Sequence, residues 1–201
     1  MSQYNDYVWA EVYNQTGNEY GTAALMGNLQ AESGIIPYRL QGDFTSTYYK
    51  SINYTDNVNS GVISRDEFIH DGKGYGLAQW TYYTRKEALY DAWQNSGYAS
   101  IGDIRFQVSF LLNEIQSSYP TVYSAIVNAT NIRDASDIVL VQFENPADQS
   151  LAVKIYRAGL GDAIYIDLAT GQPIPIPVPV PPDTPTEPTI PIWLLFKVGK
   201  H

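Results

Sequence analysis

Apolar side chains recur at helical spacing over much of the chain. The clearest case is 103–117, where apolar residues three or four positions apart fall on one face of a helix. Apolar residues also gather in five further segments: 4–14, 84–97, 119–128, 134–143 and 149–158. These patterns predict a mostly helical domain whose last helix ends at Ala158, just ahead of Gly159.

The segment 22–34 predicts a short, largely apolar helix. Thr22 is suited to cap its first turn, because a Thr hydroxyl can accept an unpaired backbone N–H. Gly34 is suited to the left-handed position that ends many helices, and Pro37 prevents the helix from continuing. Glu32 lies in the last turn of this helix.

The chain from Pro37 to His70 is polar and rich in Tyr and Asn. We expect extended hairpin and loop structure here, with a short helix near 64–68 where Ser64 and Glu67 have capping-box spacing. The next segment, 71–81, has three glycines within five positions. Such glycine density predicts a tight turn that other groups approach closely.

The composition changes near residue 171. Prolines then alternate with apolar residues, which favours polyproline II structure and excludes both helix and central strand. The last residues are too few to span a bilayer. We therefore expect a folded domain over 1–170, a proline-rich linker over 171–191 and a short apolar and basic tail over 192–201.

Composition excludes several classes of function. The net charge of −9 argues against a nucleic-acid-binding face, which needs clustered Lys and Arg. The absence of cysteine excludes disulfides, thiolate metal sites and a Cys nucleophile, and two histidines make a His-rich zinc site or a Ser-His triad a poor match. No metal or cofactor is implied. The 17 tyrosines and 4 tryptophans suit stacking on sugars as well as ordinary packing.

Glu32 is the strongest candidate for chemistry. The negative end of a helix and apolar surroundings both favour the protonated form of a carboxyl group. A glycosidase needs such an acid to protonate the leaving oxygen. Asn28, one turn earlier on the same face, is a polar neighbour that can contact substrate. The simpler alternative is an ordinary solvated glutamate at a helix end.

Several short blocks, in this order, resemble the phage tail lysozyme family. They are Asn28-Leu-Gln-Ala-Glu-Ser-Gly34, Gly74-Tyr-Gly-Leu-Ala-Gln-Trp-Thr81 with Arg85 four residues on, and Phe143-Glu-Asn-Pro146. The Glu-Ser pair and the glycine block also resemble, more distantly, goose-type lysozymes and soluble lytic transglycosylases. The resemblance covers about 4–158 and does not extend to the linker or tail.

The resemblance implies an α+β, mostly α, lysozyme-like domain of two lobes, with a small β-hairpin lobe beside a sugar-binding cleft. It implies cleavage of the peptidoglycan glycan strand, with Glu32 as the acid. Asp71 lies near the position of a water-activating aspartate in goose-type lysozymes, although the spacing differs. Asp43, on the expected hairpin, is the competing second carboxylate.

Five residues then become candidates for substrate binding. Gln79 and the backbone at Gly76 are suited to sugar hydroxyl and N-acetyl groups, and Tyr75 and Trp80 to apolar walls of the cleft. Trp80 has an alternative role as a core anchor between the lobes. Glu144 has the alternative of holding a helix N-terminus or an arginine.

The sequence thus predicts an endolysin-type muramidase of phage or prophage origin whose partner is the peptidoglycan glycan strand. If no second carboxylate is in place, the substrate's own 6-hydroxyl can attack instead, as in a lytic transglycosylase. A wall-binding or tail structural protein without catalysis is the other class. We see no signal peptide, so delivery by a holin or with the virion is expected. The oligomeric state is left open.

Overall fold

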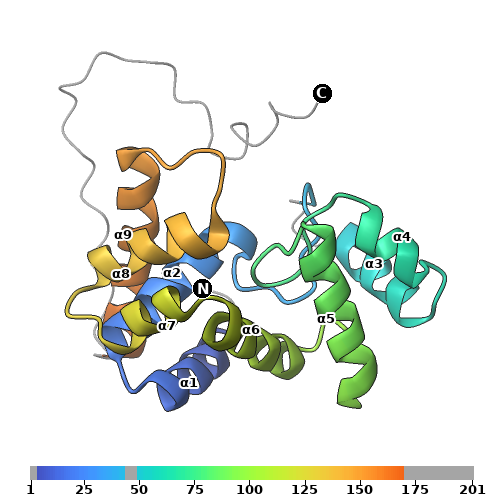
Figure 1. Cartoon of the computed structure of the whole chain (residues 1–201), viewed down its shortest axis with the longest axis horizontal. Coiled ribbons are helices and arrows are strands. Elements are labelled where there is room, and N and C mark those ends of the chain that lie inside the picture. Colours follow the sequence, from blue (N-terminus) through green and yellow to red (C-terminus); the bar gives the residue numbers. More distant parts are fainter. Residues whose placement is uncertain (1–3, 44–48, 170–201) are drawn as a thin grey trace.

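The chain folds into a mostly α-helical structure (Figure 1). The computed structural model describes residues 4–43 and 49–169. No β-strand forms within these ranges, and the elements are α1 (Asn5–Thr16), α2 (Glu19–Ser33), α3 (Tyr49–Asn59), α4 (Arg65–His70), α5 (Tyr83–Ser96), α6 (Ile104–Ser118), α7 (Pro120–Val127), α8 (Ile132–Val139), the π-helix η1 (Leu140–Glu144) and α9 (Leu151–Leu168). The helices predicted from apolar spacing are therefore confirmed.

The expected β-hairpin lobe is not seen in the described residues, where Tyr75 forms only isolated antiparallel bridges to Leu40 and Trp80. Most of the polar region is helical instead. The capping box between Ser64 and Glu67 does form and begins α4. Apolar spacing could not reveal α3, because three of the four residues on its buried face carry a hydroxyl group: Ser51, Tyr54, Thr55 and Val58.

The hydroxyl groups inside α3 are buried together with hydrogen-bond partners. Thr55 Oγ1 donates to the Ser51 carbonyl at 2.8 Å, and Ser51 Oγ donates to the Asp43 carboxylate at 2.7 Å. A buried hydroxyl is tolerated when it is hydrogen-bonded. These bonds explain how so polar a segment can pack as a helix.

Helix α2 is the centre of one lobe and packs against α1, α7, α8 and α9. It begins at Glu19, because Asn18 rather than Thr22 is the cap and accepts the Gly21 N–H at 2.9 Å. Thr22 is fully buried one turn further on. The predicted end is confirmed, since Gly34 has φ 68° and donates its N–H to Gln30.

Two glycines bring α9 unusually close to α2. A Cβ on Gly27 would lie 2.5 Å from the Gly161 backbone nitrogen, and a Cβ on Gly161 would lie 2.8 Å from the Ala23 carbonyl oxygen. This contact explains why α9 continues to Leu168 rather than ending at Ala158. Glycine usually disfavours a helix interior, but here it permits backbone-to-backbone packing.

The second lobe contains α3, α4 and α5, and Figure 1 shows it on the opposite side of the molecule from α8 and α9, with α6 between. Helix α6 contacts α1 and α7 of the first lobe and α5 of the second. Within 4–43 and 49–169, no helix has the length and apolar character to cross a membrane. The predicted linker and tail, 171–201, lie outside the described residues, so the predicted domain boundaries remain predictions.

Candidate functional site

Glu32 lies in the last turn of α2, with its side chain 18 % exposed. Its Oε1 forms an ion pair at 2.5 Å with the Nη2 of Arg157, whose own side chain is only 3 % exposed. Arg157 comes from α9, far away in the sequence. The apolar surroundings expected around Glu32 are therefore broken by a buried cation.

Asn28 helps to orient the guanidinium group of Arg157. Arg157 Nη1 donates to Asn28 Oδ1 at 3.3 Å, and Asn28 Nδ2 donates to Ser136 Oγ at 3.0 Å and to the Ala24 carbonyl at 2.9 Å. Asn28 is completely buried. The structure thus places it beneath Glu32 as a support for Arg157, not on an open surface.

Glu144 also belongs to this site. It is the last residue of the π-helix η1, and Asn145 follows it in a left-handed conformation with φ 45°. Glu144 Oε1 is buried and has no hydrogen-bond partner. Burial and then the negative charge of Glu32 raise the pKa of Glu144 well above its ordinary value, and Arg85 and Arg157 only partly oppose this shift. Irregular π turns are frequent at functional sites.

Arg85 brings α5 to the same region. It holds Glu114 of α6 through two bonds, Nε to Oε1 at 2.7 Å and Nη2 to Oε2 at 2.9 Å. Its guanidinium carbon lies 4.6 Å from the centre of the Phe143 ring, next to Glu144 in the chain. Glu32, Glu114, Glu144, Arg85 and Arg157 form what we call the five-charge cluster.

Trp80 is fully buried and donates its indole N–H to Glu114 at 2.8 Å. Tyr75 is also fully buried, with its hydroxyl 2.8 Å from Thr55 Oγ1. The structure therefore gives Trp80 the alternative position, that of a core anchor, and Tyr75 a similar one. Both are part of the hydrophobic core.

The glycine segment forms the tight turn predicted for it. Backbone bonds join Tyr75 and Trp80 in both directions, at 3.0 and 3.2 Å, and Gly76 has φ 78°. Gln79 is left-handed too, with φ 46°, and its amide donates to the carbonyls of Gly76 and Arg39 at 3.0 and 3.1 Å. The amide nitrogen of Gln79 is thus engaged in holding the turn.

Sequence reasoning overlooked Arg39, which ties the turn to the end of α2. Its Nε donates to the Ser33 carbonyl at 3.0 Å, its Nη1 donates to the Asp43 carbonyl at 2.8 Å, and its own carbonyl accepts the Gly76 N–H at 2.8 Å. An arginine only two residues after Pro37, in a chain with few cations, was the available signal. Its role depends on contacts that a sequence does not display.

The two predicted second carboxylates are each held by internal partners. Asp43 is buried and accepts both the N–H and the hydroxyl of Ser51 at 2.7 Å. Asp71 accepts the Tyr54 hydroxyl, the Lys73 N–H at 2.9 Å and the Lys86 ammonium at 2.5 Å. Burial lowers the pKa of Lys86 despite the raising effect of Asp71.

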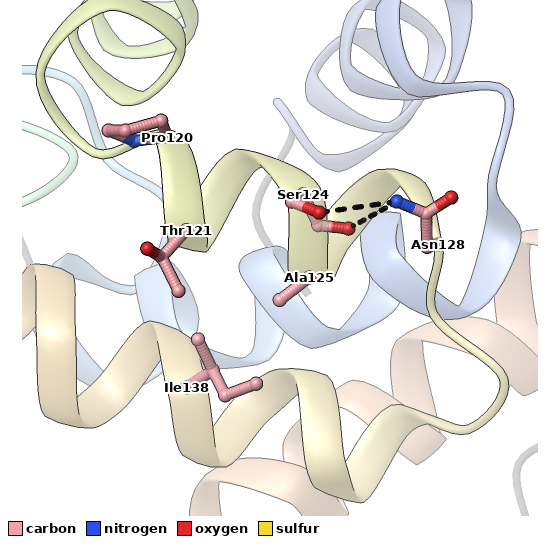
Figure 2. Close-up of a pocket in the computed structure, with 6 residues that line it drawn as sticks. All are labelled: Pro120, Thr121, Ser124, Ala125, Asn128 and Ile138. Atoms are coloured by element: carbon pink, nitrogen blue, oxygen red, sulfur yellow. Dashed lines mark hydrogen bonds between the residues drawn. The ribbon is translucent and has the colours of Figure 1, made fainter.

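The surface has a hollow next to the five-charge cluster and another that shares no residue with it. One, of about 330 Å³, lies beside α5 and α6 and includes Arg85 and Glu114 of the five-charge cluster. The other, of about 600 Å³, is an open groove between α7 and α8 (Figure 2) and contains none of the predicted site residues. Among the residues that the structure describes, no group of three or more His, Asp or Glu is placed to hold a metal ion.

Comparison with known protein families identifies the family of this chain. Residues 3–165 match the sequence profile of the family described as phage tail lysozyme. A search of curated proteins found no match. The matched range includes every predicted site residue and the whole five-charge cluster.

Proposed function

Because the chain belongs to the phage tail lysozyme family, we propose that it is a peptidoglycan glycosidase, a muramidase, with Glu32 as general acid. The position of Glu32 at the partly exposed end of a buried helix supports this assignment. There the carboxyl group can reach substrate while Arg157 pairs with it from the protein side.

Cleavage of the glycosidic bond requires one proton at the glycosidic oxygen. Protonated Glu32 delivers it as the bond between the sugar C1 and that oxygen breaks, and the leaving sugar departs as an alcohol. Water then adds to C1 and returns a proton to the site. The helix end and the braced glycine turn fix the position of the acid, which is the protein's main contribution to such a step.

The second role, activation of the attacking water, falls to Asp71 or Asp43. Either can activate water only if substrate binding releases it from its internal partners. This observation favours one alternative, a lytic transglycosylase in which the 6-hydroxyl of the substrate attacks C1. Its product carries a 1,6-anhydro ring instead of a new reducing end.

Mass spectrometry of muropeptides released from purified sacculi tests the function. A muramidase releases fragments with reducing N-acetylmuramic acid ends, and a transglycosylase releases anhydro ends. Glu32→Gln should stay folded and lose about 10²–10⁴-fold in rate, the usual effect of removing a general acid. No products from the wild-type protein would support the wall-binding or tail structural class.

Glu87→Gln is the matched control, because Glu87 is an exposed carboxylate of α5 that pairs with Arg65. Asp71→Asn and Asp43→Asn, assayed in parallel, separate the candidates for the second role. If neither changes the rate while Glu32→Gln does, the transglycosylase alternative gains. Undiminished lysis by Glu32→Gln would show that the acid has been misassigned.

We further propose that the protein acts at the bacterial wall as an endolysin, which a holin releases from the host cytoplasm. The alternative is delivery with the virion as part of the tail. Proteomics of purified virions distinguishes the two, because a tail component co-purifies at fixed stoichiometry and an endolysin does not.

A further inference from the structure

The five-charge cluster has an odd carboxyl group. Arg157 pairs with Glu32 at 2.5 Å, and Arg85 pairs with Glu114 through two bonds. Both guanidinium groups therefore have a carboxylate partner. Glu144 is the third carboxyl group, and no cation is left to pair with it in the cluster.

The position of Glu144 makes a charge on it costly. Its Oε1 is buried without a hydrogen bond. An ionised carboxylate in such a place has lost its water and gained no donor in exchange. The groups that act on it from the surrounding helices are Glu32 of α2, Arg85 of α5, Glu114 of α6 and Arg157 of α9, two of each sign. The neutral, protonated form is the one that this environment favours.

Glu32 has the opposite problem. An ion pair with Arg157 requires its carboxylate form, yet a general acid must carry a proton when the glycosidic bond breaks. The cluster thus holds its proton on Glu144, whereas catalysis requires a proton on Glu32. The charge of Glu32 acts on Glu144 and favours the proton there, so the two groups interact within the cluster.

We propose that Glu144 is the proton partner of Glu32: the two carboxyl groups hold one proton, which Glu144 supplies and Glu32 delivers to the glycosidic oxygen. This inference rests on the proposed function. Loss of the proton leaves Glu144 as a carboxylate, and Arg85 and Arg157 both favour that charge. The water that attacks C1 gives up one proton, which restores the protonated pair and balances the cycle.

The backbone supports this assignment. Glu144 ends a π turn rather than an α-helix, and the left-handed Asn145 donates its N–H back to the Leu140 carbonyl at 2.8 Å. Asn145 Oδ1 in turn accepts from Gln149 Nε2 at 2.8 Å. The chain therefore fixes an irregular, costly turn directly at the residue that has no hydrogen-bond partner for its buried oxygen. Such a turn persists only when its surroundings determine it strongly.

Glu144→Gln tests the proposal, because glutamine keeps the size and neutral charge of the protonated acid but cannot give up a proton. Turnover of dye-labelled sacculi at saturating substrate is measured from pH 4 to pH 9. We expect a loss of about tenfold or more near neutral pH, within the usual range for proton-transfer groups. We also expect the alkaline limb of the profile to move to lower pH, since Glu32 must then take its proton from solvent.

Glu87→Gln again serves as the control and should keep both the rate and the profile. Wild-type turnover and profile in Glu144→Gln would overturn the proposal. A lower rate with an unmoved alkaline limb would overturn it too, because that result reports only a structural role.

A second measurement does not use Glu144→Gln and does not depend on catalytic activity. Carboxyl ¹³C NMR follows the titration of Glu144 in the wild-type protein and in Glu32→Gln. Coupled carboxyl groups require the apparent pKa of Glu144 to be lower in Glu32→Gln, and an unchanged value would overturn the proposal. This readout stays valid even if Glu32→Gln proves active, which is the result that would defeat the proposed function instead.

Discussion

Glu32 and Asp71 show how differently two similar ion pairs can be built. Each carboxylate is 18 % exposed and lies 2.5 Å from a cation with almost no exposure, Arg157 in one lobe and Lys86 in the other. Around Asp71 the groups are complementary: one carboxylate receives an ammonium, a hydroxyl and a backbone N–H. Around Glu32 there is a surplus carboxyl group, Glu144, with a buried oxygen that nothing satisfies.

The proposed roles of Glu32 and Glu144 depend on this difference. Ion-pair distance and exposure are the same in both lobes, so neither identifies the site. Perturbed proton affinities also occur in purely structural networks. What distinguishes the Glu32 side is that its carboxyl groups outnumber its cations and that one buried carboxyl oxygen has no hydrogen bond.

The largest expected difference in stability is between Asp71→Asn and Glu32→Gln. Asp71→Asn leaves Lys86 buried without a counter-charge, and breaking a buried pair in this way costs about 3–5 kcal/mol. Glu32→Gln should cost clearly less, because Glu144 can ionise and face Arg157 in its place. Urea unfolding at pH 7 measures both free energies of unfolding. Equal losses would mean that the two pairs are not different in kind.

The two close-packed glycines give a second comparison. Gly27→Ala would place a Cβ 2.5 Å from the Gly161 backbone, which cannot move without shifting α9 and Arg157. We expect a loss of about 1–3 kcal/mol or more, as for other overpacked cores, together with lost activity. Gly97→Ala, which keeps a positive φ of 76° but meets no atom within 4 Å, separates packing from backbone strain.

Gly76→Ala probes the other lobe. Its Cβ would lie 2.6 Å from Gln107 Oε1, and it would have to keep φ 78°. Gln107 cannot easily withdraw, because it accepts the Leu77 N–H and donates to the Ile101 carbonyl. We expect a loss of about 1–2 kcal/mol from the left-handed backbone alone. Wild-type thermal stability and turnover would show that this turn tolerates a side chain.

The pH dependence of stability sharpens the comparison further. The pKa of Glu144 is raised in the folded state, so the folded chain binds more protons and the wild type loses stability as pH rises above about 4.5. Glu144→Gln removes this loss, worth about 1.4 kcal/mol for each pKa unit of the shift. The variant should therefore be more stable than the wild type at pH 8 and not at pH 4. Thermal unfolding at both values checks the sign.

The smallest effect is expected from the tail. Deleting residues from Gln172 onward should leave the thermal midpoint nearly unchanged, because a proline-rich segment buries few backbone groups in a core. Both ion pairs lie before this point. A fall of several degrees would show that the tail contributes to the folded domain.

Local sequence patterns are sufficient to predict the helices whose burial depends on apolar residues. Apolar spacing predicts α1, α5, α6 and α7, and Gly34 predicts where α2 ends, because these are local properties of the chain. The density of glycines in 71–81 likewise predicts the tight turn at Gly76. The end of a helix also singles out Glu32, whereas Glu144 became a candidate through the family resemblance of its block.

The surroundings of these residues depend on tertiary contacts, which local patterns do not reveal. Helix α3 escaped prediction because Ser51 and Thr55 are buried through hydrogen bonds that form after packing. Arg157 reaches Glu32 across 125 positions in the chain, because Gly27 and Gly161 let two helices touch. Local pattern reports which face of a segment is buried. The identity of the partner charge, and so the chemistry of a carboxyl group, depends on contacts between segments that are distant in the sequence.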